Sequence, residues 1–197
     1  ALCDSGQLDN TVILFSSDHG DYLGDHGLIG KGQFFEASCH VPLIARLPGG
    51  PQDCSNIDLV ALADVTPTML SLAGADLPDY MDFMPLPELG LPRAGRDYLY
   101  GMMWGGWMCF DGRWKLCKYS TGEHMLFDLL EDPTEERNML NDGACGDTYL
   151  RLDRALTEEV MRSTMASHHD KIVYDTDLSG DVDFGLSSWQ RPYPKPL

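Results

Sequence analysis

A polar, glycine-rich segment holds the residues whose types and spacing could support chemistry. Asp18 and His19 directly follow a short apolar run, Thr11 to Ser16, which predicts a buried strand of an α/β sheet. In open α/β sheets, ligands bind outside the carboxyl ends of the strands. A carboxylate and an imidazole placed there are suitable ligands for a divalent metal, and Gly20 would let the backbone turn sharply behind them. The same Asp-His-Gly triplet also fits a plain turn.

The segment continues to a lysine that stands between two glycines. Lys31 lies twelve positions after His19 and is flanked by Gly30 and Gly32. Flanking glycines let an anion approach the backbone closely, and the ammonium supplies a counter-charge. A solvated lysine is the structural alternative. His26, between these groups, is a candidate metal ligand or proton donor, or a loop residue with its hydrogen bonds satisfied.

The elements that must position these residues alternate between strand and helix patterns. A second strand is predicted from Val41 to Leu47. A helix is predicted from about Asp64 to Ala73, with Gly74 ending it. Residues 77–93 carry many prolines and little periodicity, which is typical of a linker.

Beyond the linker, short segments separated by glycines or polar turns predict an antiparallel meander. Asp111-Gly112 is a hairpin signal within it. The segments are Asp97 to Met103, Trp107 to Phe110, Arg113 to Tyr119 and Met125 to Leu129.

Two helix signals follow the meander. Asp132, Pro133 and Glu135 have the pattern of a helix start, with a capping acid, a proline at the first position and a second acid. A longer amphipathic helix is predicted from about Thr148 to Ala166. Residues 168–197 are polar and end in a proline-rich stretch, so we expect an extended tail that could lie on another subunit of a homo-oligomer.

Composition excludes several classes of function. The chain has 197 residues, 43% of them hydrophobic, and a net charge of −17 from 31 acidic and 14 basic residues. This acidic excess argues against nucleic acid as a partner, because lysine and arginine hold phosphate backbones. No apolar run is long enough for a membrane span. None of the six cysteines forms a C-x-x-C pair, so we interpret them as reduced thiols in the core or on the surface.

The order of residues in the first segment resembles a known family. The letters D-H-G-D-x-L-G-D-H-G-L-x-G-K-G, followed by a V-P-L strand, are similar to the sulfatase family within the alkaline phosphatase superfamily. Two later stretches extend the resemblance: D-V-T-P-T-M-L, which starts at Asp64, and F-D-L with E-D-P-T-E-E, which ends near Asn138. The similarity runs in ordered pieces from about Leu8 to Leu140.

The resemblance implies a fold class and a division of the chain. We expect an α/β fold, the C-terminal part of an alkaline-phosphatase-like sandwich with a mixed sheet and flanking helices. Residues 1–95 would end this core and carry half of the metal and anion site. Residues 96–167 would form a small antiparallel-sheet subdomain with a packed C-terminal helix, and residues 168–197 the tail.

The resemblance also implies roles for individual residues. Asp18 and His19 match two metal ligands of the family, and Lys31 matches the lysine that contacts the sulfate or phosphoryl oxygens of the substrate. His26 has no role that can be transferred with it, and stays a catalytic candidate only. Histidine at the second ligand position resembles the branch with choline sulfatases and phosphonate monoester hydrolases. An imidazole is a softer donor than an amide oxygen, so manganese, iron or zinc is expected beside calcium.

One required element of the family has no match in this sequence. Sulfatases use a cysteine or serine converted to formylglycine within C-x-[PAS]-x-R, and Cys109 comes closest but has Asp111 at the middle position. The chain starts at Ala1 and not at a methionine, so we expect an N-terminal part of the same protein to supply this nucleophile. The chain alone is then expected to be inactive.

The function implied is metal-dependent hydrolysis of sulfate esters, with a small anionic ester as substrate. A phosphonate monoester or phosphodiester hydrolase on the same scaffold is the first alternative. A non-catalytic binding or scaffold protein is the second, and it predicts that no formylglycine motif precedes this chain. The sequence leaves the cellular compartment open between the cytoplasm and a periplasmic or secreted location.

Overall fold

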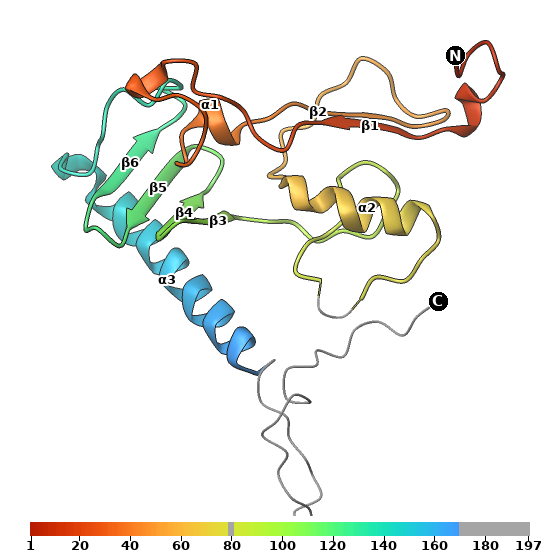
Figure 1. The fold of residues 1–197 in the computed structure, drawn as a ribbon. Helices are drawn as coiled ribbons and strands as arrows, with labels where there is room; N and C mark the ends of the chain where they lie inside the picture. Colours follow the sequence, from red (N-terminus) through yellow and green to blue (C-terminus); the bar gives the residue numbers. More distant parts are fainter. Residues whose placement is uncertain (79–80, 170–197) are drawn as a thin grey trace, which may run out of the picture.

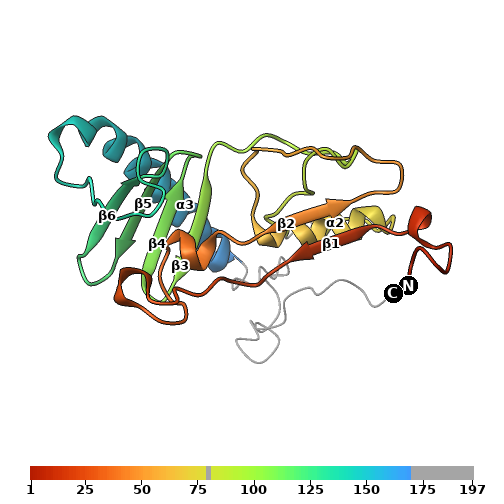
Figure 2. The ribbon, with the colours of Figure 1, turned by 90° about the horizontal axis from the view of Figure 1, so that it is seen from above.

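The computed structural model describes residues 1–78 and 81–169, which form two structural parts (Figure 1). The first part holds a two-stranded antiparallel ribbon, β1 (Ile13–Ser16) and β2 (Leu43–Arg46), in which Phe15 pairs with Ile44. Helix α2 (Val65–Leu72) runs beneath this ribbon (Figures 1 and 2). Both predicted strands are therefore present, each slightly shorter than expected.

The first strand is not buried within this chain, contrary to the prediction. The side chain of Phe15 is 57% exposed and that of Ile44 is 60% exposed. An apolar, β-branched run predicts a strand because of its residue types, but burial requires neighbouring strands or helices on its faces. Among the described residues, the ribbon has two strands only.

Helix α2 ends where the glycine predicts. Gly74 has a φ of +74°, its N–H donates to Ser71 O at 3.0 Å, and the N–H of Ala75 donates to Leu70 O at 2.9 Å. This is the left-handed helix ending that glycine favours. At the other end, a short 3-10 helix, Leu62–Asp64, leads into α2.

Asp64 connects the start of α2 to the irregular segment of residues 84–96. Its carboxylate is fully buried and accepts hydrogen bonds from both terminal nitrogens of Arg96, at 2.7 and 2.9 Å. It also accepts from the N–H of Ala61 and, more weakly, of Met84. The bidentate pair holds residues 84–96 against the helix without regular secondary structure.

The second part is a four-stranded antiparallel meander, as predicted. The strands pair in the order β3-β4-β5-β6. They are β3 (Leu99–Met103), β4 (Gly106–Phe110), β5 (Trp114–Tyr119) and β6 (His124–Asp128). Asp111 and Gly112 form the turn between β4 and β5, where Asp111 Oδ1 accepts from the N–H groups of Arg113 and Trp114, and Gly112 has a φ of +96°.

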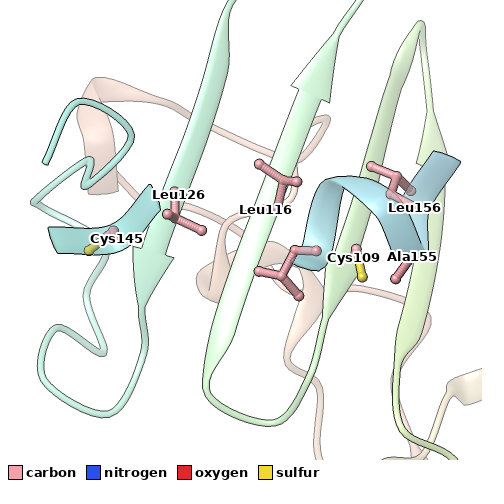
Figure 3. Close-up of a cluster of buried hydrophobic side chains, with 7 residues drawn as sticks. Cys109, Leu116, Leu126, Cys145, Ala155 and Leu156 are labelled. Carbon is pink, nitrogen blue, oxygen red and sulfur yellow. The ribbon is translucent and has the colours of Figure 1, made fainter. Parts of the chain in front are cut away.

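Helix α3 (Gly146–His169) covers one face of this sheet. The buried cluster between them is apolar, with Leu116 and Leu126 from the sheet facing Leu156 from the helix (Figure 3). Leu152 of the same helix belongs to this cluster and is fully buried. Ala155, Cys109 and Cys145 complete the cluster, and the two cysteines are free thiols. Since successive strand residues point to opposite faces, Lys115, Cys117 and Phe127 lie on the other face.

The predicted helix start at Asp132 is wrong. The Asp132 carboxylate does accept from the N–H groups of Glu136 and Arg137, at 3.2 and 2.8 Å, as a capping acid would. No helix follows, because Glu135 takes a left-handed conformation with a φ of +59°. Residues 131–142 form a turn and an irregular connection instead, and the long helix begins at Gly146, after the short 3-10 helix Gly143–Cys145.

The expected tail, residues 168–197, begins with the last two residues of α3, so its start is wrong there; residues 170–197 lie outside the described part of the chain. The division at residues 95 and 167 stays a prediction. Within the described residues, no helix combines the length and the apolar composition that a membrane crossing requires.

Candidate functional site

The segment with the predicted site residues forms a loop between β1 and α1 (Glu36–Cys39). Its end, at Phe35 and Glu36, packs on the face of the meander opposite α3. Tyr22 holds this loop together, because its buried hydroxyl donates to Gln33 O at 3.0 Å and accepts from Gln33 N–H at 2.7 Å. Its ring packs edge-on against Phe35, which in turn contacts Phe127 of β6. An aromatic cluster therefore anchors the loop to the sheet.

Asp18 and His19 lie directly after β1, as predicted. The exposed carboxylate of Asp18 has Oδ2 at 3.4 Å from His19 Nε2. The other ring nitrogen, Nδ1, is 2.7 Å from Gly20 O and must donate to it, since a carbonyl only accepts. In the neutral imidazole, this hydrogen bond leaves Nε2 with its lone pair free for a metal.

This donor set fits one side of a divalent metal site. With metal–ligand bonds of about 2.0–2.3 Å, neighbouring donors in one coordination sphere lie roughly 3–3.5 Å apart, and the 3.4 Å between Asp18 and His19 agrees with this. Among the described residues, no group of three histidine, cysteine or acidic side chains is arranged to hold a metal. Asp18 and His19 would therefore be two ligands of a larger set.

Lys31 belongs to the same loop as this pair. Its side chain is exposed, and Gly30 and Gly32 on either side have φ values of +79° and +136°, so both glycines use conformations that other residues rarely adopt. The pKa of Asp18 lies below its ordinary value. Partial desolvation raises this pKa, but His19, the hydrogen bond from the His19 N–H and the charge of Lys31 together lower it by more. The loop thus carries a carboxylate and an imidazole in contact, and an ammonium whose charge acts on the carboxylate in the same direction as His19.

His26 takes a different position. It has a φ of +54° in the short 3-10 helix Asp25–Gly27, and its ring stacks on Phe35 with the centroids 3.8 Å apart. This contact gives His26 a packing role in the loop. Its place as a catalytic group stays a prediction.

Gly20 is needed for a reason other than a sharp turn. It does not have a left-handed φ, but a Cβ atom there would lie 2.0 Å from Ala37 O in α1. Its N–H donates to Ser38 O at 2.9 Å. Glycine is therefore required because the backbone behind the Asp-His pair touches α1 directly.

Sequence reasoning missed a buried ionic cluster behind this loop. Lys115 of β5 is 2% exposed and its Nζ lies 2.7 Å from Glu36 Oε1 and 2.6 Å from Glu135 Oε1. The contact with Glu36 is a hydrogen bond, whereas Glu135 Oε1 makes a close ion pair that is poorly aligned for one. The only local signal is a lysine next to apolar residues in a predicted strand, and it does not identify either acid.

Comparisons with known proteins point to one family. The sulfatase family model matches residues 1–75. An arylsulfatase of Clostridium perfringens is 35% identical over 152 residues, which cover 72% of this chain and 32% of that protein. A choline-sulfatase of Rhizobium meliloti is 34% identical over 184 residues, which cover 88% of this chain and 34% of that protein.

A solved structure shows the same fold with a different named activity. The phosphonate monoester hydrolase of Silicibacter pomeroyi superposes with a TM-score of 0.70 at 28% identity, over 82% of this chain and 37% of that one. The chain thus spans about a third of the length of the curated relatives it matches. From the matched family model, these relatives and the shared fold, we conclude that the chain belongs to the sulfatase family.

Proposed function

We propose that the protein containing this chain hydrolyses sulfate esters with a divalent metal, and that Asp18, His19 and Lys31 form one side of its active site. One observation carries the proposal. The Gly20 carbonyl orients the imidazole of His19, so that its free nitrogen and the Asp18 carboxylate lie side by side at the end of a strand. The similarity to arylsulfatase and choline-sulfatase supports sulfate esters as the substrate class.

The residues of this chain would each do one part of the work. A bound divalent metal supplies Lewis acidity toward an ester oxygen. Asp18 and His19 would hold that metal, and the hydrogen bond to Gly20 would keep the ring of His19 in the orientation that binding requires. The Lys31 ammonium would stabilise negative charge on the transferred group. His26 is a further candidate for the proton donor, and to act as one its ring would have to leave the stacking contact with Phe35.

The remaining groups would come from an N-terminal part of the same protein. We expect that part to supply the formylglycine nucleophile and further acidic metal ligands. The exposed ribbon supports this expectation, because a two-stranded sheet with Phe15 and Ile44 in solvent is marginal by itself. Further strands paired with β1 or β2 would cover these side chains and complete the sheet.

Phosphonate monoester hydrolysis is the second candidate. The likeness to the phosphonate monoester hydrolase of Silicibacter pomeroyi favours it. The Asp18-His19 pair also favours it, because the pair resembles the branch of the family that contains phosphonate monoester hydrolases. The tetrahedral anionic groups of the two esters are close in size and charge, so both fit a metal beside a lysine. Relative catalytic efficiency separates the two functions.

The experiment is a parallel assay of the full-length protein on an aryl sulfate and an aryl phosphonate ester, after chelation and re-addition of calcium, manganese or zinc. A higher kcat/KM for the sulfate supports the proposed function, and a higher value for the phosphonate supports the second candidate. Asp18→Asn should abolish metal-restored activity, whereas Asp58→Asn, an exposed acid outside the loop, should not. Hydrolysis of neither ester with any of these metals would favour the non-catalytic alternative.

A further inference from the structure

The buried ionic cluster joins the loop of the candidate site to the second part of the fold. It consists of Lys115 from β5, Glu36 from α1 and Glu135 from the connection after β6, and we call it the Lys115 cluster. Glu135 is only 3% exposed. Burial lowers the pKa of Lys115, but the two carboxylates raise it by more, so the lysine stays charged.

The cluster holds the backbone of α1 as well as its side chains. Glu135 Oε2 accepts a hydrogen bond from the Glu36 N–H at 2.6 Å. At the other end of the helix, Glu36 Oε2 lies 2.8 Å from His40 Nδ1. Helix α1 has only four residues, and a helix this short does not persist without tertiary contacts. Its position therefore depends on the groups that bind Glu36.

Helix α1 in turn determines where the candidate metal ligand lies. Ser38 O accepts from the Gly20 N–H at 2.9 Å, and Ala37 O occupies the space that a Gly20 side chain would fill. The carbonyl of the same Gly20 accepts the hydrogen bond from His19 Nδ1. A continuous path of direct contacts runs from Glu135 through α1 and Gly20 to the imidazole of His19.

A buried ionic cluster connects two elements with a smaller net gain in stability than apolar packing often gives, but with more defined geometry. Removing three charged groups from water carries a large desolvation cost, and well-packed apolar residues of similar volume often stabilise a protein as much or more. Hydrogen bonds to charged groups are directional, however, and fix both the position and the rotation of the groups they join. Apolar packing between α1 and the sheet would leave α1 freer to slide.

We propose that the Lys115 cluster is a positioning device, which sets the orientation of His19 for metal binding through α1 and Gly20. This inference rests on the proposed function, since it takes His19 as a metal ligand. Outer groups that orient a ligating histidine typically change metal affinity by about 10- to 100-fold when they are removed. The cluster is more distant than a direct hydrogen-bond partner, so we expect a loss of about 10-fold, at the lower end of that range.

The test measures the Kd of the full-length protein for Mn²⁺ by calorimetry, together with the melting temperature of the metal-free protein. Glu135→Gln is the main variant, because it removes the charge and retains an oxygen that can accept from the Glu36 N–H. Lys115→Met is the stronger variant. Lys118→Met is the matched control. Lys118 lies on the same strand as Lys115 but on the face toward α3, and the substitution removes its ion pair with Asp153 of α3.

We expect Glu135→Gln and Lys115→Met to weaken Mn²⁺ binding while Lys118→Met leaves the Kd unchanged. If Lys115→Met does not fold, the comparison of Glu135→Gln with Lys118→Met decides. Unchanged affinity in Glu135→Gln, or an equal loss in Lys118→Met at similar stability, would overturn the inference. Asp18→Asn separates it from the proposed function: if that variant binds Mn²⁺ normally, the metal assignment fails, and the inference fails with it.

Discussion

Replacing Gly20 with alanine tests the contact between the Asp-His pair and α1. The new Cβ would lie 2.0 Å from Ala37 O, whereas such atoms are essentially never closer than 3.0 Å. Because this neighbour is a backbone oxygen, no side-chain rotation relieves the clash. The loop and α1 must separate by about 1 Å, which is the difference between these two distances.

The expected free energy follows from two opposing effects. Forcing an extra carbon into a packed site costs typically about 1–3 kcal/mol. Alanine also reduces the freedom of the unfolded chain, which stabilises by about 0.4–1 kcal/mol where the backbone conformation suits it, and Gly20 does not use a left-handed φ. The net destabilisation of Gly20→Ala should be about 1–2 kcal/mol.

Urea denaturation of the full-length protein measures this change, and the Kd for Mn²⁺ reports whether the His19 ring has moved. Gly95→Ala is the control, because Gly95 has no left-handed φ and a Cβ added there would meet no other atom within 4 Å. It should leave stability unchanged or slightly raised. If Gly20→Ala is as stable as Gly95→Ala and binds Mn²⁺ normally, the close contact with α1 does not hold the site.

Three further predictions address charge. Lys31→Ala should reduce turnover by roughly 10²–10³-fold, as loss of one preorganised donor does, with a stability change below about 0.5 kcal/mol because the side chain is exposed. Asp64→Asn should destabilise the protein by about 3 kcal/mol in urea denaturation, because it leaves the guanidinium of Arg96 buried without its counter-charge. Hydrogen bonds from Arg113 hold the pKa of Asp128 below its ordinary value of 3.8, so this pair stabilises the fold above about pH 4 and its contribution is lost as the pH falls further. The melting temperature of Asp128→Asn should therefore fall less steeply with acid than that of the wild type.

Each of these results can go against the structure. Near-normal turnover of Lys31→Ala would remove the lysine from the site. A stability loss for Asp64→Asn no larger than for Asp9→Asn, an exposed acid paired with Arg46, would mean that burial adds nothing to the Asp64 pair. Parallel melting curves of Asp128→Asn and wild type in acid would show that this carboxylate does not keep a lowered pKa.

The sequence alone determined the local elements and the loop between them. Glycines and polar turns between short segments predicted the four strands of the meander, because turn signals such as Asp111-Gly112 act over a few residues. The residue order from Asp18 to Lys31 indicated the family, and the same order placed both candidate metal ligands, Asp18 and His19, after a strand. The helix that ends at Gly74 was predicted for the same reason, since a left-handed ending is a property of the glycine itself.

Contacts between distant segments decided the rest. Asp132 carries a capping pattern, yet Glu135 leaves the helical conformation, and its carboxylate reaches the N–H of Glu36, 99 positions earlier. Gly20 is required by α1 and not by its own turn. No local sequence pattern predicts the contact of Glu135 with Glu36 or that of Gly20 with α1, because a residue's neighbours in sequence do not determine what packs against it.

The Lys115 cluster shows this limit most clearly. The letters W-K-L-C-K-Y predict a strand and place two lysines on opposite faces of it, since the side chains of a strand alternate. They do not tell which lysine is buried. Only the folded chain brings Glu36 and Glu135 to the same face as Lys115, and Asp153 to the face of Lys118, because electrostatic pairing depends on distance in space and not on separation along the sequence.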